Sequence, residues 1–117
     1  MKQVMSIFNQ FKKPNTVIKN LSRENIDSVE QFILGVKSEF GYGVAEDFQQ
    51  AVNWYTKSAK QGNIKAQAYL AWLYAEGKGV ERDYEKSLFW YNKAADQGDI
   101  NAKSEVFRIT NLMNKSQ

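Results

Sequence analysis

The chain has 117 residues, enough for one domain, and its 43% hydrophobic and 25% charged residues are ordinary for a globular protein. It contains no cysteine and no histidine, which excludes disulfide scaffolds, thiolate zinc sites and Ser-His-Asp triads. The net charge of +3 is uneven, because residues 1–26 carry +4 and residues 27–117 carry −1. A nearly neutral body does not favour a long phosphate-binding surface.

Residues 1–26 are expected to form a basic arm with degenerate capping helices. Ahead of Pro14, apolar residues at helical spacing predict a short amphipathic helix over residues 2–12, and residues 15–25 predict a second, degenerate helix. The N-terminus is too short and too polar for a signal peptide, and no apolar stretch is long enough to span a bilayer. We therefore expect a soluble, cytoplasmic protein. The apolar residues of the first helix are Val4, Met5, Phe8 and Phe11.

The rest of the chain repeats itself at a step of 36 residues. Laid over residues 67–102, residues 31–66 are identical at 14 of 36 positions. A fixed period of this length is typical of stacked supersecondary units. The identical residues of the first copy are Gln31, Leu34, Gly41, Gly43, Val44, Asp47, Trp54, Tyr55, Lys57, Ala59, Gln61, Gly62, Ile64 and Ala66.

Each copy predicts two helices, called helix A and helix B below. The first copy predicts helix A over residues 28–40 and helix B from Asp47 to Gly62, with a glycine turn between them. The second copy predicts helix A over residues 64–76 and helix B from Asp83 to Gly98.

The register is supported by helix-capping residue types that recur 36 apart, at Asp27, Asn63 and Asp99. A third helix A should therefore begin near residue 100 and end the array. We expect repeat 1 over residues 27–62, repeat 2 over residues 63–98 and a C-terminal half-repeat cap over residues 99–117. The whole chain should be all-α, with about six helices and no sheet.

Residues 68–102, AYLAWLYAEGKGVERDYEKSLFWYNKAADQGDINA, resemble a Sel-like repeat of the suppressor/enhancer-of-lin type, a relative of the tetratricopeptide repeat. They carry the family's glycine turn, its Trp-Tyr pair and its terminal Gln-Gly, but have Ala71 and Ser87 where the family has glycine and alanine. The resemblance covers residues 27–106. It implies α/α-hairpins stacked in a right-handed superhelix that acts as an adaptor in protein–protein complexes. It implies no catalytic residue, metal or cofactor.

Most conspicuous residues have structural interpretations. Trp54 and Trp90 are predicted to pack in the repeat core or between repeats. The paired glycines of each turn do not form a phosphate loop, because no strand precedes them and no Lys-Ser/Thr follows. The carboxylates near residue 80 are explained as caps and solvated charge, since their spacing does not match a calcium loop.

Apolar residues also occur where the repeat does not require them. In tetratricopeptide-like arrays, the helix A face opposite the packing stripe lines a concave groove. An exposed apolar patch there is typical of a partner site, and tryptophan and arginine are frequent hot spots. The alternative is that the N-terminal segment folds back and covers the patch. The predicted partner-binding residues are Phe32, Val36, Phe40, Trp72 and Arg108, on a face that should also hold Val29, Lys65, Ala68, Ala75, Glu76, Asn101 and Ser104.

These features favour a non-enzymatic interaction protein that grips another protein in its groove. One form is a bacterial immunity protein that neutralises a cognate toxin or secreted effector, and a general adaptor or scaffold in a signalling or secretion complex is equally compatible. Binding of nucleic acid or an anionic membrane through the basic arm is a further hypothesis, opposed by the neutral body. No convergent site for a small-molecule substrate is evident.

Overall fold

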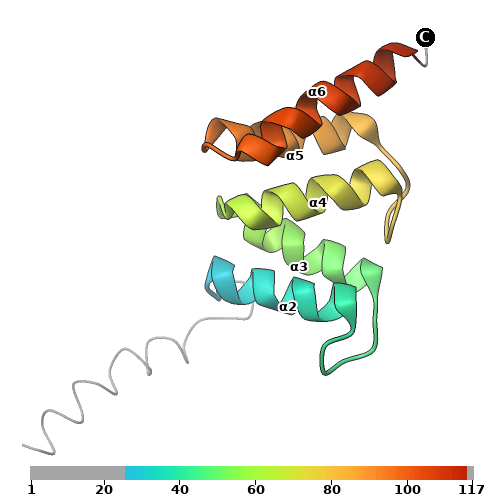
Figure 1. The fold of residues 1–117 in the computed structure, drawn as a ribbon. Coiled ribbons are helices and arrows are strands. Elements are labelled where there is room, and N and C mark those ends of the chain that lie inside the picture. Colours follow the sequence, from blue (N-terminus) through green and yellow to red (C-terminus); the bar gives the residue numbers. More distant parts are fainter. Residues whose placement is uncertain (1–25, 116–117) are drawn as a thin grey trace, which may run out of the picture.

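The computed structural model describes residues 26–115, and these form five α-helices with no strand among them (Figure 1). Each helix contacts the next one along the chain. The predicted all-α repeat solenoid is therefore confirmed, while the helices predicted over residues 2–12 and 15–25 lie outside the described residues. The five helices are α2 (Ser28–Phe40), α3 (Phe48–Lys60), α4 (Ile64–Glu76), α5 (Tyr84–Asp96) and α6 (Ile100–Lys115).

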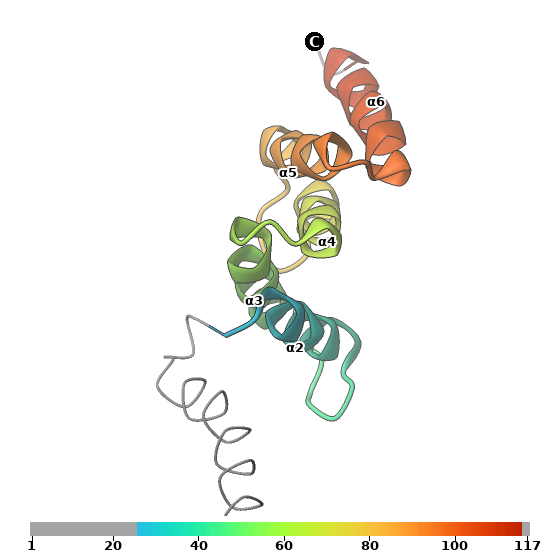
Figure 2. The same cartoon turned by 90° about the vertical axis from the view of Figure 1, so that its left-hand side faces the viewer.

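The helices are arranged in two rows. The three A helices, α2, α4 and α6, form one row, and the two B helices, α3 and α5, form the other (Figure 2). The A helices begin at residues 28, 64 and 100, as the repeat register predicts. This arrangement leaves the outward side of the A row free to line a surface that three successive helices share.

Each helix begins at the cap residue that the sequence predicts. The Asp47 carboxylate accepts a hydrogen bond from the Gln50 amide at 3.1 Å, and Asp83 accepts one from the Lys86 amide at 3.0 Å. Asp27, Asn63 and Asp99 cap the three A helices in the same manner. These bonds satisfy amides that the first helical turn otherwise leaves unpaired.

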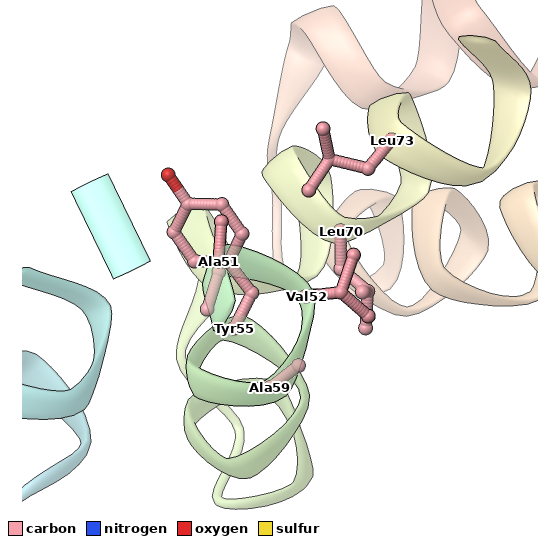
Figure 3. Packing of buried hydrophobic residues seen from close by; sticks show 7 residues of the cluster. Ala51, Val52, Tyr55, Ala59, Leu70 and Leu73 are labelled. Carbon is pink, nitrogen blue, oxygen red and sulfur yellow. The ribbon is translucent and has the colours of Figure 1, made fainter. Parts of the chain in front are cut away.

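The core is built from small residues around a few large ones. Alanines of α3 and α4 surround Tyr55, Leu70 and Leu73, all of which are fully buried (Figure 3). Gly35 of α2 lies directly against the Tyr55 ring, and a Cβ atom at this position would come within 2.5 Å of it. A second cluster of the same kind joins α4, α5 and α6 around Tyr91 and Ile109.

A glutamine at the end of each B helix ties neighbouring elements together. The Gln97 amide nitrogen donates to the Gln67 side-chain oxygen and to the Gly62 carbonyl, both at 2.9 Å. Gln61 makes the equivalent bonds to Gln31 and to the Ile26 carbonyl. Each glutamine thus connects helix A of its own repeat to the segment that precedes that helix.

The outer face of α2 differs from the equivalent faces of the later A helices. Ala66 and Leu73 of α4 are buried against α3. The positions 36 residues earlier hold Glu30 and Lys37, and both are exposed. Charged side chains at these positions are suited to contact with water.

Two turn glycines with the same backbone conformation offer a matched test of the repeat interface. Gly43 and Gly79 both have φ of 75°, but a Cβ at Gly79 would lie 2.4 Å from the Phe48 carbonyl, whereas one at Gly43 meets nothing within 4 Å. We expect Gly43→Ala to cost about 1 kcal/mol through the left-handed backbone alone. Gly79→Ala should cost about 3 kcal/mol or more, because the turn must also move away from α3. Urea denaturation of the two variants measures the difference, and equal losses would contradict this contact.

The two repeat tryptophans, both predicted to pack in the repeat core or between repeats, occupy different surroundings. Both side chains are only partly buried. Trp90 packs against both core clusters, whereas Trp54 belongs to neither cluster. The Lys57 ammonium lies 4.9 Å from the centroid of the Trp54 ring. We therefore expect Trp90→Ala to lower the free energy of unfolding by about 3 kcal/mol and Trp54→Ala by about 1 kcal/mol. Thermal melts of both variants test this order, which a larger loss for Trp54→Ala would reverse.

Candidate functional site

A pocket of about 600 Å³ opens along the A row, and we call it the central pocket. Its walls come from the C-terminal end of α2, the part of α4 between Lys65 and Trp72, one residue of α5 and the beginning of α6. The repeat stacking alone therefore brings together residues that are more than 60 positions apart in the chain. The lining residues are Glu39, Phe40, Lys65, Ala68, Tyr69, Trp72, Tyr91, Asp99, Asn101, Ala102 and Glu105.

A second pocket of about 530 Å³ lies at the N-terminal ends of α2 and α4, and we call it the N-terminal pocket. Lys65 borders both pockets, so the two form neighbouring parts of one surface, named the groove below. The N-terminal pocket is lined by Val29, Phe32, Ile33, Gly62, Asn63, Ile64, Lys65 and Gln97.

Aromatic rings fix the wall between the two pockets. Tyr69 meets Phe32 edge to face with ring centroids 5.1 Å apart, and it meets Tyr55 in the same way at 5.5 Å. Edge-to-face pairs at these distances are favourable beyond the area they bury. This part of the groove is therefore held in place by the core beneath it.

Trp72 lines the central pocket and is only partly buried. Its ring packs against both core clusters. The Lys78 ammonium lies 5.2 Å from the Trp72 ring centroid and 5.3 Å from that of Phe48, within the range of cation–π attraction. The indole thus has a structural role as well as an accessible edge.

One carboxyl group at the edge of the central pocket is buried. Glu39 is 6% exposed, and its Oε1 accepts a hydrogen bond of 2.6 Å from the Tyr55 hydroxyl, which points from α3 toward α2 (Figure 3). Burial raises the pKa of Glu39, and the Tyr55 hydrogen bond and the Lys78 charge offset only part of that rise. Burial and the nearby Glu39 likewise raise the pKa of Tyr55.

The far wall of the central pocket carries further acidic groups. Asp99 caps α6 by accepting from the Ala102 amide at 3.1 Å. Glu105 lies six residues later and pairs with Arg108 at 2.8 Å on the surface. Burial, followed by the Glu105 charge, raises the pKa of Tyr91. Exposed ion pairs such as Glu105–Arg108 contribute about 0–1 kcal/mol, so an incoming charge can rearrange this one.

The predicted partner-binding residues fall in three different places. Phe40 and Trp72 line the central pocket, and Phe32 lines the N-terminal pocket. Val36 packs against the first core cluster, and Arg108 lies outside the pocket lining, beside Glu105. The expectation that none of these residues takes part in the repeat's own packing was wrong for three of them, because Phe32, Val36 and Trp72 all pack against core residues.

One further expectation about the groove was wrong. Ala75 was expected on the concave face, but it is buried in the second core cluster. Lys65, Ala68 and Asn101 do line the central pocket as expected. A helical turn of 3.6 residues places Ala75 three positions beyond Trp72 toward α5, away from the open side.

Several groove residues escaped the sequence interpretation. Ile33 and Tyr69 occupy equivalent positions of the two repeats, four residues after Val29 and Lys65, and this spacing alone could have placed them on the same face. Glu105 is the third member of this series. Tyr91 is a buried core residue that also borders the central pocket. No feature of the sequence marked Glu39 as a groove residue, because the residues around it do not indicate that its side chain will contact Tyr55.

Two features are absent from residues 26–115, the part of the chain that the structure describes. No group of three or more histidine, cysteine, aspartate or glutamate side chains in this range could hold a metal ion. No helix within the same range combines the length and apolarity needed to cross a membrane.

The buried Glu39 carboxyl predicts a specific pH dependence of stability. Because its pKa is raised by folding above the ordinary 4.5, its contribution is fully present below about that pH and is lost as the pH rises through the folded-state pKa. Glu39→Gln keeps an acceptor for Tyr55 but cannot ionise. We expect the stability of the wild type relative to Glu39→Gln to fall as the pH rises. Urea denaturation between about pH 4 and pH 8 tests this trend, and a constant difference would contradict it.

Comparison with solved structures places the fold among bacterial helical-repeat proteins. The c5321 protective antigen of uropathogenic Escherichia coli, described as displaying an SLR fold, is 39% identical with a TM-score of 0.64 over 64% of this chain and 16% of that chain. A Sel1 repeat protein from Oxalobacter formigenes is 36% identical with a TM-score of 0.67 over 68% and 33%. This chain thus spans a third or less of those two proteins.

The cysteine-rich protein B of Helicobacter pylori shares the fold at 23% identity, with a TM-score of 0.63 over 66% of this chain and 58% of that chain. None of the curated proteins has a sequence that matches this chain. The family model of the Sel1 repeat matches residues 31–63 and 64–99, which together make up more than half of the chain. The protein therefore belongs to the Sel1 repeat family.

Proposed function

We propose that this protein is a non-enzymatic interaction module that binds a segment of another protein in the groove. Proteins with Sel1 repeats generally mediate protein–protein interactions. The groove extends over the three A helices, α2, α4 and α6, and is therefore long enough to hold an extended or helical segment. Its lining holds aromatic rings and a few charged groups, which is the composition of a recognition surface.

The observation that carries the proposal is the apolar face that α2 presents to water. Val29, Ile33 and Phe40 are 55%, 45% and 49% exposed, and all three line the groove. They belong to one side of α2, because their spacing of four and seven residues is helical. Leaving such a face in water is unfavourable, and exposed apolar patches of this kind usually mark binding sites.

The predicted site residues take different roles in this proposal. Phe40 and Trp72 supply apolar contact area in the central pocket, while Phe32 does so in the N-terminal pocket. Val36 supports the wall from below, since it packs against the core. Arg108 contributes only at the edge, through its pair with Glu105.

The groove is better suited to a protein than to a nucleic acid. The central pocket is lined by three carboxyl groups and one ammonium group, from Glu39, Asp99, Glu105 and Lys65. Phosphate backbones are bound by clustered lysine and arginine, and carboxylates repel them.

Two forms of the function fit the groove equally. A bacterial immunity protein would hold a cognate toxin or secreted effector there, and a general adaptor would hold one member of a signalling or secretion complex. Both would act in the cytoplasm. Mass spectrometry identifies the bound protein, and an assay of that protein's activity with and without this chain separates the two forms. A toxin partner loses its activity on binding, whereas a member of a signalling or secretion complex does not.

Two exposed phenylalanines allow a matched test of the groove. Phe40 lines the central pocket and stacks on Tyr42, while Phe89 is 53% exposed on α5 and meets Trp90 edge to face. We expect Phe40→Ala to weaken partner binding by about 2 kcal/mol, roughly thirtyfold, as the loss of a central aromatic contact does. Phe89→Ala should leave binding within about twofold of the wild type.

The measurement is capture of partner from native lysate by immobilised wild type and variants, followed by titration of the captured protein. Thermal melts accompany it, because both phenylalanines are half exposed and should contribute little to folding. Trp72 is a poorer probe, since its ring is part of both core clusters. Equal binding by the wild type and Phe40→Ala would exclude the groove as the partner site.

A further inference from the structure

The chemistry of the groove changes in one direction across the A row. One register position, repeated every 36 residues, holds Ile33 on α2, Tyr69 on α4 and Glu105 on α6. The position four residues earlier holds Val29, Lys65 and Asn101. Apart from the buried Glu39 at the end of α2, the groove is therefore apolar on α2, aromatic with one lysine on α4, and polar with acidic groups on α6.

This gradient restricts what the groove can hold. An occupant must place apolar side chains on Val29, Ile33 and Phe40, which are exposed in the described structure. It must also offer positive charge toward Asp99 and Glu105, because carboxyl groups outnumber ammonium groups in the central pocket. The stems of lysine side chains can lie along aromatic rings while their charged ends reach such carboxylates.

The chain carries a segment with this composition ahead of α2 in its own sequence. Residues 2–13, KQVMSIFNQFKK, contain five apolar residues, three lysines and no acidic residue. Phe8 and Phe11 lie three residues apart, with Lys12 and Lys13 directly after them. If helical, the segment would be about 20 Å long, comparable to α2 itself.

The connection to α2 is long enough for this segment to reach any part of the groove. Residues 14–26 separate it from Asp27, and 13 residues span up to about 45 Å when extended. A short tether also holds the segment at an effective concentration of about 1 mM. An intrinsic dissociation constant of about 100 µM would then keep the groove occupied roughly ten times as often as empty.

We propose that residues 2–13 of the same chain occupy the groove, with Phe8 and Phe11 on the apolar face of α2 and Lys12 and Lys13 toward Asp99 and Glu105. A partner must displace this segment before it can bind. The inference deepens the proposed function, since it uses the same groove and adds an internal competitor. Releasing the segment should strengthen partner binding about tenfold. The reason is that the apparent affinity for the partner is proportional to the fraction of protein whose groove is empty.

The absence of native cysteine makes a direct test on the full chain simple. Asn9→Cys carries a single spin label next to Phe8, and amide NMR signals report which helices the label approaches. We expect strong broadening at Ile33, Tyr69 and Glu105 in the groove and little at Lys57 on α3. Broadening that is uniform, or that is strongest on α3, would overturn the proposal.

Charge variants of the labelled chain provide the matched control. Lys12→Glu with Lys13→Glu should release the segment and restore at least half of the lost groove signal. Lys19→Glu with Arg23→Glu makes the same change in net charge outside residues 2–13, and should leave the broadening as it was. Release by both pairs would mean that net charge alone holds the segment, which contradicts the proposed contacts.

A mixture of labelled, unenriched chain with unlabelled, isotope-enriched chain separates the same-chain contact from a contact between two copies. Persistent groove broadening in the mixture would overturn the proposal in favour of exchange between copies. None of these measurements involves a partner protein. A negative result therefore leaves the proposed function standing, and a failure of Phe40→Ala to weaken partner binding leaves the label result valid.

Discussion

The close contact between one tyrosine and one small residue in each repeat sets the geometry of the whole array. Tyr55 is fully buried, and a Cβ on Gly35 would come within 2.5 Å of its ring. In the second repeat Tyr91 is buried in a cluster with Ala71, the residue at the position of Gly35. Because the ring fills the space between helix A and helix B, the two helices cannot move closer or slide without a clash or a void. The remaining core is mostly alanine, which lets successive helices approach.

Equivalent positions of the two repeats perform different tasks because their neighbours differ. The turn glycine of the second repeat, Gly79, packs against α3. Its equivalent in the first repeat, Gly43, has no atom within 4 Å of the position that a Cβ would take. The inward-facing leucine of α4, Leu73, is replaced by the exposed Lys37 on α2. A solenoid distinguishes its ends from its middle in this way, since each repeat is stabilised mainly by its neighbours.

The groove arises from positions that this packing leaves free. Along the outward side of the A row, no neighbouring described helix fixes the residue type, so the three helices carry different chemistry there: apolar on α2, aromatic on α4 and acidic on α6. The groove is nevertheless joined to the core, because Trp72 and Phe32 pack against core residues and Glu39 bonds to the buried Tyr55. The groove surface is thus continuous with the packing beneath it.

The sequence by itself determined the family, the helix boundaries and the caps. A period of 36 residues with aspartate, glycine and tryptophan at fixed positions is a local signal, and local signals are sufficient where each helix contacts only the next one. Only the tertiary structure decided which residues face the groove. The burial of Ala75, the bond between Tyr55 and Glu39 and the unequal surroundings of Trp54 and Trp90 all depend on contacts between helices. Such contacts are set by how the helices pack, which a repeating pattern along one chain does not encode position by position.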